Sequence, residues 1–130
     1  MKEVFVVSNN VFSPIGQTSA ENFMQLKNRT TGIKQHENNI ADHPVYASLF
    51  NDSDLPLQDY KNSYTKFERV LIASISDAIT QTGLELTNDK TILILSSTKG
   101  NISLLETETF NNELKERIAL HTSAKLIAKH

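Results

Sequence analysis

Two short runs of the chain are apolar at nearly every position, and one longer segment is apolar at every third or fourth position. The runs are Val4–Val7 and Thr91–Leu95, and continuous apolar runs of this length are typical of strands covered on both faces of a parallel sheet. Helical spacing extends from Tyr64 to Thr82, and Gly83 provides a natural stop. The pattern therefore predicts an α/β protein in which helices pack on a mixed sheet.

A shorter helix is expected before this one, from about Ser19 to Asn28. Thr18 and Glu21 have the Ser/Thr-x-x-Glu spacing of a capping box, in which two side chains satisfy free backbone amides at a helix start. Helical spacing would then turn Phe23 and Leu26 toward the core.

A third helix is expected after the second apolar run. Ser103 and Glu106 repeat the capping-box spacing, which predicts a helix that begins there and continues to about Leu120. Its apolar side would consist of Phe110, Leu114 and Ile118.

A fourth helix is expected at the end of the chain, where Thr122 or Ser123 can cap it. Its apolar pattern still continues at Lys129 and His130, where the sequence stops with no capping glycine or asparagine. This ending is the one expected of a fragment. An isolated fragment of a sheet protein is expected to self-associate or to leave an apolar sheet edge exposed.

The segment 31–63 is rich in Asn, Asp, His, Pro and Ser, and its apolar pieces are short, as at Val45-Tyr46 and Leu49-Phe50. It is expected to be an irregular excursion with about one short strand or turn. Loops of this length within a compact domain are often functional. Nothing in the composition marks a second domain, so residues 1–130 are expected to belong to one domain.

The turn after the first apolar run has a recognisable order: Ser-Pro-x-Gly, a helix with an aromatic residue, then Gly-Ile. This order resembles the N-terminus of the β-ketoacyl acyl-carrier-protein synthases, which are condensing enzymes of the thiolase fold. The matching residues are Ser13, Pro14, Gly16, Phe23, Gly32 and Ile33.

Two later segments resemble the same family in the same order. One is the helix Phe67–Leu84, and the other is Ile92–Asn101 with its Ser97-Thr98-Lys99-Gly100 loop. The resemblance implies a partial thiolase-like fold, incomplete as given, in which residues 1–130 are the N-terminal part of a ketoacyl-synthase domain. It also implies turns with a structural role, at Ser13, Pro14, Gly16, Gly32, Gly83, Thr98 and Gly100.

Enzymes of this family hold the acyl group on a cysteine, and the chain has no cysteine. A thiolate combines nucleophilicity near neutral pH with good leaving-group character, and no residue here replaces it. The resemblance therefore implies a scaffold segment that is inactive alone, with no catalytic, cofactor-binding or metal-binding residue of its own. The longer parent protein would receive its acyl group from acyl carrier protein and would form a homodimer or pair with a related subunit.

Two alternatives remain open at the level of sequence. One is a noncatalytic relative, similar to a chain-length factor, which keeps the condensing fold as a partner subunit. The other is a small α/β domain that binds phosphate through the loop Ser97–Asn101. That loop lacks the Gly-x-x-x-x-Gly-Lys-Ser/Thr order of a P-loop, so a structural turn is the favoured interpretation.

The remaining polar residues favour no other chemistry. His36, Asp42 and His43 share a polar loop, but their spacing matches no standard metal site. Glu113 and Arg117 are spaced as an i,i+4 ion pair on a solvated helix face. Further acidic residues on that face are Glu106, Glu108 and Glu116, and His121 and His130 are expected to be exposed.

Composition sets the cellular context. A net charge of −2 and scattered lysines give no basic stripe for nucleic acid. No apolar run approaches the length of a membrane span, and the N-terminal run is too short for a signal peptide. The lack of cysteine fits a reducing compartment, so a cytoplasmic location is expected.

Overall fold

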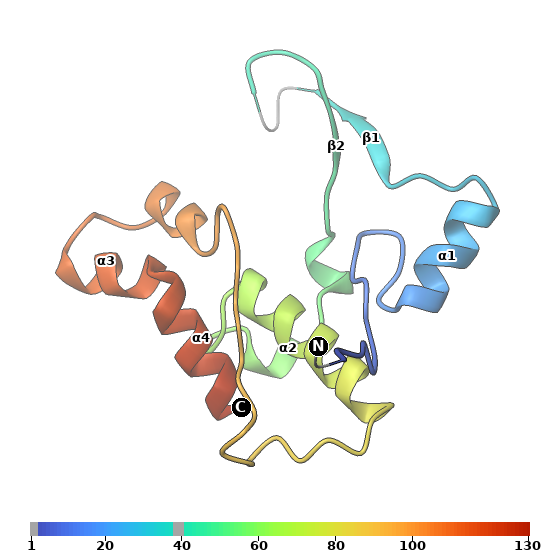
Figure 1. The fold of residues 1–130 in the computed structure, drawn as a ribbon. Coiled ribbons are helices and arrows are strands. Elements are labelled where there is room, and N and C mark those ends of the chain that lie inside the picture. The colour runs from blue at the N-terminus through green and yellow to red at the C-terminus, as the bar shows by residue number, and fades with distance from the viewer. Residues whose placement is uncertain (1–2, 38–40) are drawn as a thin grey trace. The chain divides into compact units, whose positions relative to one another are not determined.

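The structure is a computed structural model that describes residues 3–37 and 41–130. Within these residues it is a small mixed α/β protein with four α-helices and one two-stranded sheet. Figure 1 follows these elements from the N-terminus to the C-terminus. No helix in the described part of the chain is long and apolar enough to cross a membrane.

The chain divides into two compact units. Unit 1 comprises the residues up to Pro56 together with Ser74–Thr82, and unit 2 comprises Leu57–Ala73 together with Gly83–His130. Helix α2, Lys66–Thr80, therefore contributes its first half to unit 2 and its second half to unit 1.

The first helix of unit 1 is α1, Ser19–Lys27, which confirms the first predicted helix. The Thr18 side chain accepts from the Glu21 backbone amide, and the Glu21 carboxylate accepts from the Thr18 amide, so the predicted capping box is present. The predicted burial of Phe23 and Leu26 is wrong, because these side chains are 66% and 65% exposed.

The segment 31–63 contains more regular structure than one short strand. Strand β1, Ile33–His36, pairs antiparallel with strand β2, Val45–Ser48 (Figure 1). Ile33 lies opposite Ser48 in the register. Neither four-residue strand alternates between polar and apolar residues, so the sequence pattern for a strand is weak. The backbone hydrogen bonds between the two strands hold the hairpin together. Two short 3-10 helices follow at Asp52–Asp54 and Gln58–Tyr60.

Unit 2 contains helices α3, Asn112–Ile118, and α4, Leu120–Lys129, which follow each other directly (Figure 1). The predicted helix start at Ser103 is wrong, because a 3-10 helix occupies Ile102–Glu106 and α3 begins only after Asn111. The Asn111 side chain accepts from the Leu114 amide at 2.8 Å, so asparagine rather than Ser103 is the N-cap.

The predicted burial of Phe110 and the predicted cap of the last helix are also wrong. Phe110 precedes α3 and is 65% exposed, so it is not part of an apolar helix face. Helix α4 begins at Leu120, before either predicted cap, and Ser123 is buried inside it. The hydrophobic core of unit 2 consists of Ile72, Leu114 and Ile127.

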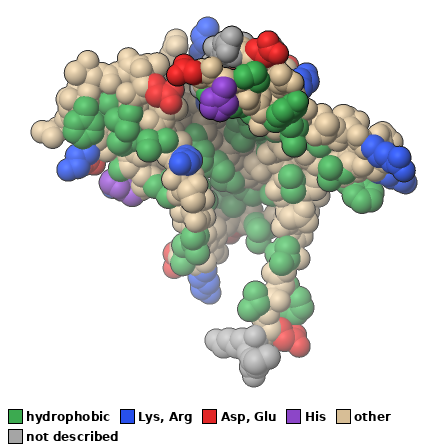
Figure 2. Space-filling view, turned by 90° about the horizontal axis from the view of Figure 1, so that it is seen from above, with side chains coloured by type: hydrophobic (Ala, Val, Ile, Leu, Met, Phe, Trp, Pro, Cys, Tyr) green, Lys and Arg blue, Asp and Glu red, His purple; other side chains and the backbone are tan. Residues whose placement is uncertain are grey.

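The two continuous apolar runs are not strands in the structure, which corrects the prediction that both are strands covered on both faces of a sheet. Val4–Val7 and Thr91–Leu95 lie outside every strand ladder of the described residues. Val4, Val6 and Ile94 are 93%, 84% and 85% exposed. A strand needs a neighbour to satisfy its backbone groups, and the only ladder formed here joins β1 to β2 among the described residues. On the face drawn in Figure 2, hydrophobic side chains form several separate groups among polar and charged ones.

Candidate functional site

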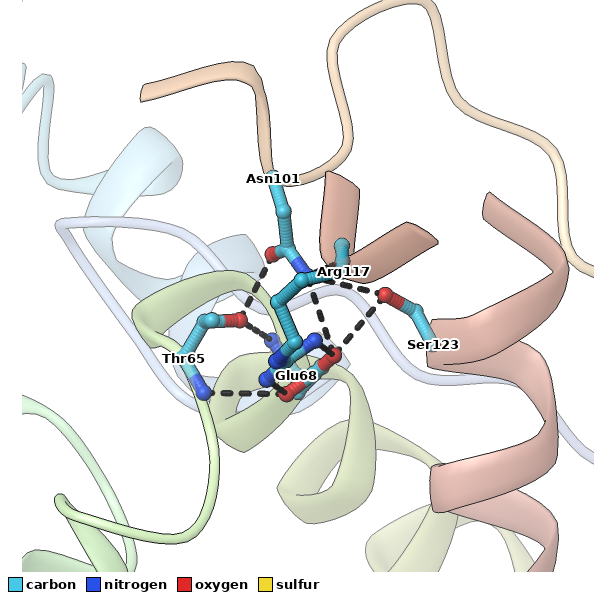
Figure 3. A network of polar contacts seen from close by, with 5 residues as sticks. All are labelled: Thr65, Glu68, Asn101, Arg117 and Ser123. Atoms are coloured by element: carbon cyan, nitrogen blue, oxygen red, sulfur yellow. Dashed lines mark hydrogen bonds and ion pairs between the residues drawn. The ribbon is translucent and has the colours of Figure 1, made fainter. Parts of the chain in front are cut away.

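The carboxylate of Glu68, in the first turn of α2, accepts hydrogen bonds from five donor atoms. Its side chain is fully buried, and its contacts come from three other segments of unit 2 (Figure 3). We call the set Thr65, Glu68, Asn101, Arg117 and Ser123 the Glu68 cluster.

Arg117 of α3 provides the charge that a buried carboxylate requires. Its Nη1 and Nη2 donate to Oε1 and Oε2 of Glu68, each at 2.6 Å. Two parallel bonds of this kind fix both the orientation and the position of the pair. The predicted partner of Arg117 was Glu113, one helical turn away, so that pairing is wrong.

Three neutral donors complete the coordination of the carboxylate. Ser123 Oγ and Asn101 Nδ2 donate to Oε1 at 2.8 Å and 3.0 Å, and the Thr65 backbone amide donates to Oε2 at 3.0 Å. The Glu68 amide in turn donates to Thr65 Oγ1 at 3.3 Å, so Thr65 and Glu68 form a capping box at the start of α2. This Thr-x-x-Glu spacing is the sequence signal that could have identified Glu68.

Asn101 connects the cluster to the loop that follows the second apolar run. It is 1% exposed, accepts from Thr65 Oγ1 at 2.6 Å, and donates to Ser123 Oγ at 3.0 Å as well as to Glu68. An amide can accept on one side and donate on the other, which is what this position between a hydroxyl donor and a carboxylate requires.

The electrostatics of the cluster favour a permanent anion. Burial raises the pKa of Glu68, but the hydrogen bonds from Arg117, Thr65, Ser123 and Asn101 together outweigh it and lower the pKa from 4.5 to about 2. The hydrogen bond to Glu68 raises the pKa of Arg117. A carboxylate with so low a pKa and five donors is a poor proton acceptor near neutral pH, so the cluster is suited to holding segments together rather than to acid-base catalysis.

The loop Ser97–Gly100 leads directly into Asn101, and its geometry is that of a turn closed by a serine. Ser97 Oγ accepts from the amides of Lys99 and Gly100 at 3.2 Å and 2.9 Å. Gly100 has a φ of +52°, a conformation that glycine adopts without steric cost. Thr98 lies exposed between them. Two of the amides that a phosphate would need are therefore already bonded within the loop.

The Ser13–Gly16 turn of unit 1 is held by a second buried amide, that of Asn22 on α1. Ser13 and Gly16 exchange backbone hydrogen bonds around Pro14, and Ser13 Oγ donates to Asn22 Oδ1. Asn22 Nδ2 in turn donates to the carbonyls of Val11 and Gly16 at 2.8 Å. These contacts fix the turn to the helix that follows it.

The glycines of the predicted turns differ in how much space surrounds them. A Cβ on Gly16 would lie 2.8 Å from the Asn22 backbone nitrogen, and a Cβ on Gly32 would overlap Ser48 Oγ. A Cβ on Gly83, beyond the end of α2, would meet nothing within 4 Å. A Cβ is therefore opposed by backbone at Gly16, by side-chain atoms at Gly32, and by nothing at Gly83.

The remaining candidates take no part in the Glu68 cluster. His36 is on β1, where its Nε2 is 3.2 Å from the Ala47 carbonyl oxygen, and Asp42 and His43 are exposed beyond it. His121 faces Glu116 at 3.6 Å on the surface. His130 packs edge-on against Tyr60 and Tyr64 at ring-centroid distances of 5.9 Å and 5.4 Å. Among the described residues no group of three or more metal-ligating side chains converges.

Comparisons with known protein families, with curated proteins and with solved structures found no match to this chain.

Proposed function

We propose that this chain forms the N-terminal part of the scaffold of a β-ketoacyl acyl-carrier-protein synthase. The observation that carries the proposal is the exposure of the two apolar runs, with Val6 84% and Ile94 85% exposed. Both runs have the composition of doubly covered strands. A thiolase-like fold, in which both runs would join a larger sheet, would remove this apolar surface from water.

The order of motifs along the chain supports the same family. The Ser13–Gly16 turn, helix α2 and the Ser97–Gly100 loop occur in the sequence in which the condensing enzymes carry them. The first and last of these are anchored by buried amides, those of Asn22 and Asn101. Anchoring at both places suits a segment whose task is to hold strands and turns in position.

The chemistry of the proposed parent enzyme lies outside this segment. Its cysteine thiolate would attack an acyl thioester and release the thiol of acyl carrier protein. Loss of CO2 from a malonyl thioester would then give a carbanion that attacks the bound acyl group, so that a 3-oxoacyl thioester forms and the cysteine thiolate leaves. The chain has no cysteine, and the one fully buried carboxylate of the described residues is engaged in five hydrogen bonds.

The test uses the product of the whole gene, expressed from its natural start to its natural stop. We expect a cysteine between small residues at a strand-to-helix turn and two later histidines. After incubation with acyl carrier protein that bears an acyl group, intact-mass spectrometry should detect an acyl adduct on that cysteine. After malonyl carrier protein is then added, it should detect a 3-oxoacyl group on the carrier protein. The 130-residue chain is the matched control and should acquire no acyl group.

Two results would overturn the proposal in different ways. Alanine or glutamine at the nucleophile position, with binding to a related subunit, would establish the chain-length-factor-like alternative instead. A gene product with no such fold that binds inorganic phosphate at the amides of residues 98–101 would establish the phosphate-binding alternative. The bonds from Lys99 and Gly100 to Ser97 Oγ make that second outcome the less expected. Cytoplasmic location and homodimerisation belong to the proposal and are tested with the same gene product.

A further inference from the structure

A hollow in unit 1 separates the Ser13–Gly16 turn from the β1–β2 hairpin. Its volume is about 480 Å³, which is within the range of sites for small organic ligands. The apolar part of its wall is formed by Pro14, Ile15, Leu49 and Phe50. Phe50 is supported from behind by Phe12, with ring centroids 5.8 Å apart.

The charge of the hollow has one sign. Its lining contains Lys34 and His36 and no aspartate or glutamate. Both residues are on β1 and two positions apart, so their side chains leave the same face of the strand. Gln35, between them, points to the other face and accepts from the Tyr46 hydroxyl at 2.9 Å.

The backbone holds the two basic side chains at the hollow. Lys34 lies opposite Ala47 in the hairpin register, and this small neighbour leaves room beside the lysine. His36 Nε2 is 3.2 Å from the Ala47 carbonyl oxygen, which fixes the ring at the edge of the site. Lys34 is exposed, and its ammonium makes no ion pair among the described residues.

We propose that this hollow binds a small organic monoanion, a carboxylate attached to an apolar body. The carboxylate would accept from the Lys34 ammonium, and the apolar body would cover Ile15, Leu49 and Phe50. A phosphate ion would use the charge but not the apolar wall, and an amine would meet like charge. This inference goes beyond the proposed function, because it does not depend on whether the chain belongs to a condensing enzyme.

The test is a titration of the 130-residue protein with phenylacetate near neutral pH, followed by amide NMR. We expect saturable shifts at Gly32, Lys34 and Phe50 with millimolar affinity. Phenethylamine, which carries a similar body and the opposite charge, and inorganic phosphate should cause no saturable shift at these amides. Equal responses to phenylacetate and phenethylamine, or no saturation by phenylacetate, would overturn the proposal.

Two variants assign the charge and the apolar contact. Lys34→Gln should weaken phenylacetate binding by roughly threefold to fivefold, the effect of one exposed charge, while Lys115→Gln on α3 should leave it unchanged. Leu49→Ser should weaken binding without altering the shifts of α1. Lys34 and Leu49 are both exposed, so the substitutions should preserve the amide spectrum elsewhere. Unchanged affinity in Lys34→Gln would contradict the proposed role of the ammonium.

Discussion

Arg117 binds Glu68 through both of its terminal nitrogens, at 2.6 Å each, although the two residues are 49 positions apart. The ion pair joins the first turn of α2 to α3 within unit 2. Glu113, four residues before Arg117, is exposed and hydrated, whereas Glu68 is removed from water and gains far more from a cation. The long-range partner is therefore favoured over the local one.

Replacing Glu68 should show how much this pair contributes to stability. Glu68→Gln keeps the shape of the side chain, but it removes the charge opposite Arg117 and turns an amide donor toward the surrounding donors. We expect the free energy of unfolding to fall by roughly 3 kcal/mol, the cost of breaking a buried pair from one side. Urea denaturation followed by circular dichroism measures this change.

The matched control is Glu113→Gln, which tests the pairing that helical spacing predicts. Because Glu113 is exposed and Arg117 already binds Glu68, this variant should lose less than about 0.5 kcal/mol. If the two glutamine variants are equally destabilised, the Glu68 cluster does not have the structural importance inferred here.

The same pair should make stability depend on acid pH. The pKa of Glu68 is about 2 in the folded chain and near 4.5 when unfolded, so the unfolded state binds more protons between these values. The stabilisation is fully present above about pH 4.5 and is lost as the pH falls toward about 2. Chemical denaturation at several pH values should give a steeper acid slope for the wild type than for Glu68→Gln.

Asp54 supplies an internal reference for that experiment. Hydrogen bonds from Asn51 and Ser53 lower its pKa, so it contributes an acid slope of the same sign. Because Asp54 is present in both proteins and belongs to unit 1, its contribution cancels in the comparison. Identical slopes for the wild type and Glu68→Gln would show that Glu68 titrates normally.

Local signals in the sequence predicted the helices better than the sheet. The capping box at Thr18 and Glu21 and the apolar period of α2 are encoded within a few residues, so both helices are found where expected. Strand pairing depends on neighbours that no local window contains, and so the runs at Val4–Val7 and Thr91–Leu95 were assigned to a sheet that the described residues do not form.

The Glu68 cluster escaped the sequence analysis for a related reason. A Thr-x-x-Glu capping box at Thr65 is visible in the sequence, but its carboxylate is ordinarily exposed. Burial of Glu68 depends on Asn101, Arg117 and Ser123, which are 33, 49 and 55 positions away. Only the folded arrangement of unit 2 brings these donors together.

Gly16 and Gly83 have different surroundings, so replacing each by alanine should have opposite effects on stability. In Gly16→Ala the new Cβ would lie 2.8 Å from a backbone nitrogen of α1, which cannot move without disturbing the turn. We expect a loss of roughly 1 to 3 kcal/mol, as for overpacking. Gly83→Ala meets open space and should be neutral or stabilising by up to about 1 kcal/mol. Thermal denaturation of both variants distinguishes them, and equal losses would contradict the inferred packing at Gly16.

The exposed apolar runs should govern self-association. Val6→Asp and Ile94→Asp place charges on side chains that are 84% and 85% exposed, so each should change stability by about 0.5 kcal/mol or less. Both should reduce association of the isolated chain, measured by sedimentation velocity, because they interrupt contiguous apolar surface. Phe110→Asp is the control at an isolated exposed aromatic and should have a smaller effect. Unchanged association in both run variants would show that these segments do not mediate it.

Arg29 should be a site where glycine stabilises the chain. It follows α1 with a φ of +59°, and the amides of Arg29 and Thr30 donate to the carbonyls of Leu26 and Gln25 at 3.0 Å and 2.9 Å. This is the Schellman ending of a helix, in which the left-handed position usually belongs to glycine. A residue with a Cβ pays a steric cost there of roughly 1 kcal/mol.

Arg29→Gly should therefore raise the free energy of unfolding by roughly 0.5 to 1 kcal/mol, less the entropy that glycine adds to the unfolded chain. Lys27→Gly, two residues earlier and inside α1, should instead lower it by about 1 kcal/mol, because glycine is a poor helix former. The two changes in the free energy of unfolding have opposite signs because of backbone conformation alone, since both substitutions remove one exposed positive charge. Destabilisation by Arg29→Gly of the same size as by Lys27→Gly would mean that the Arg29 side chain stabilises the helix end by more than its backbone strain costs.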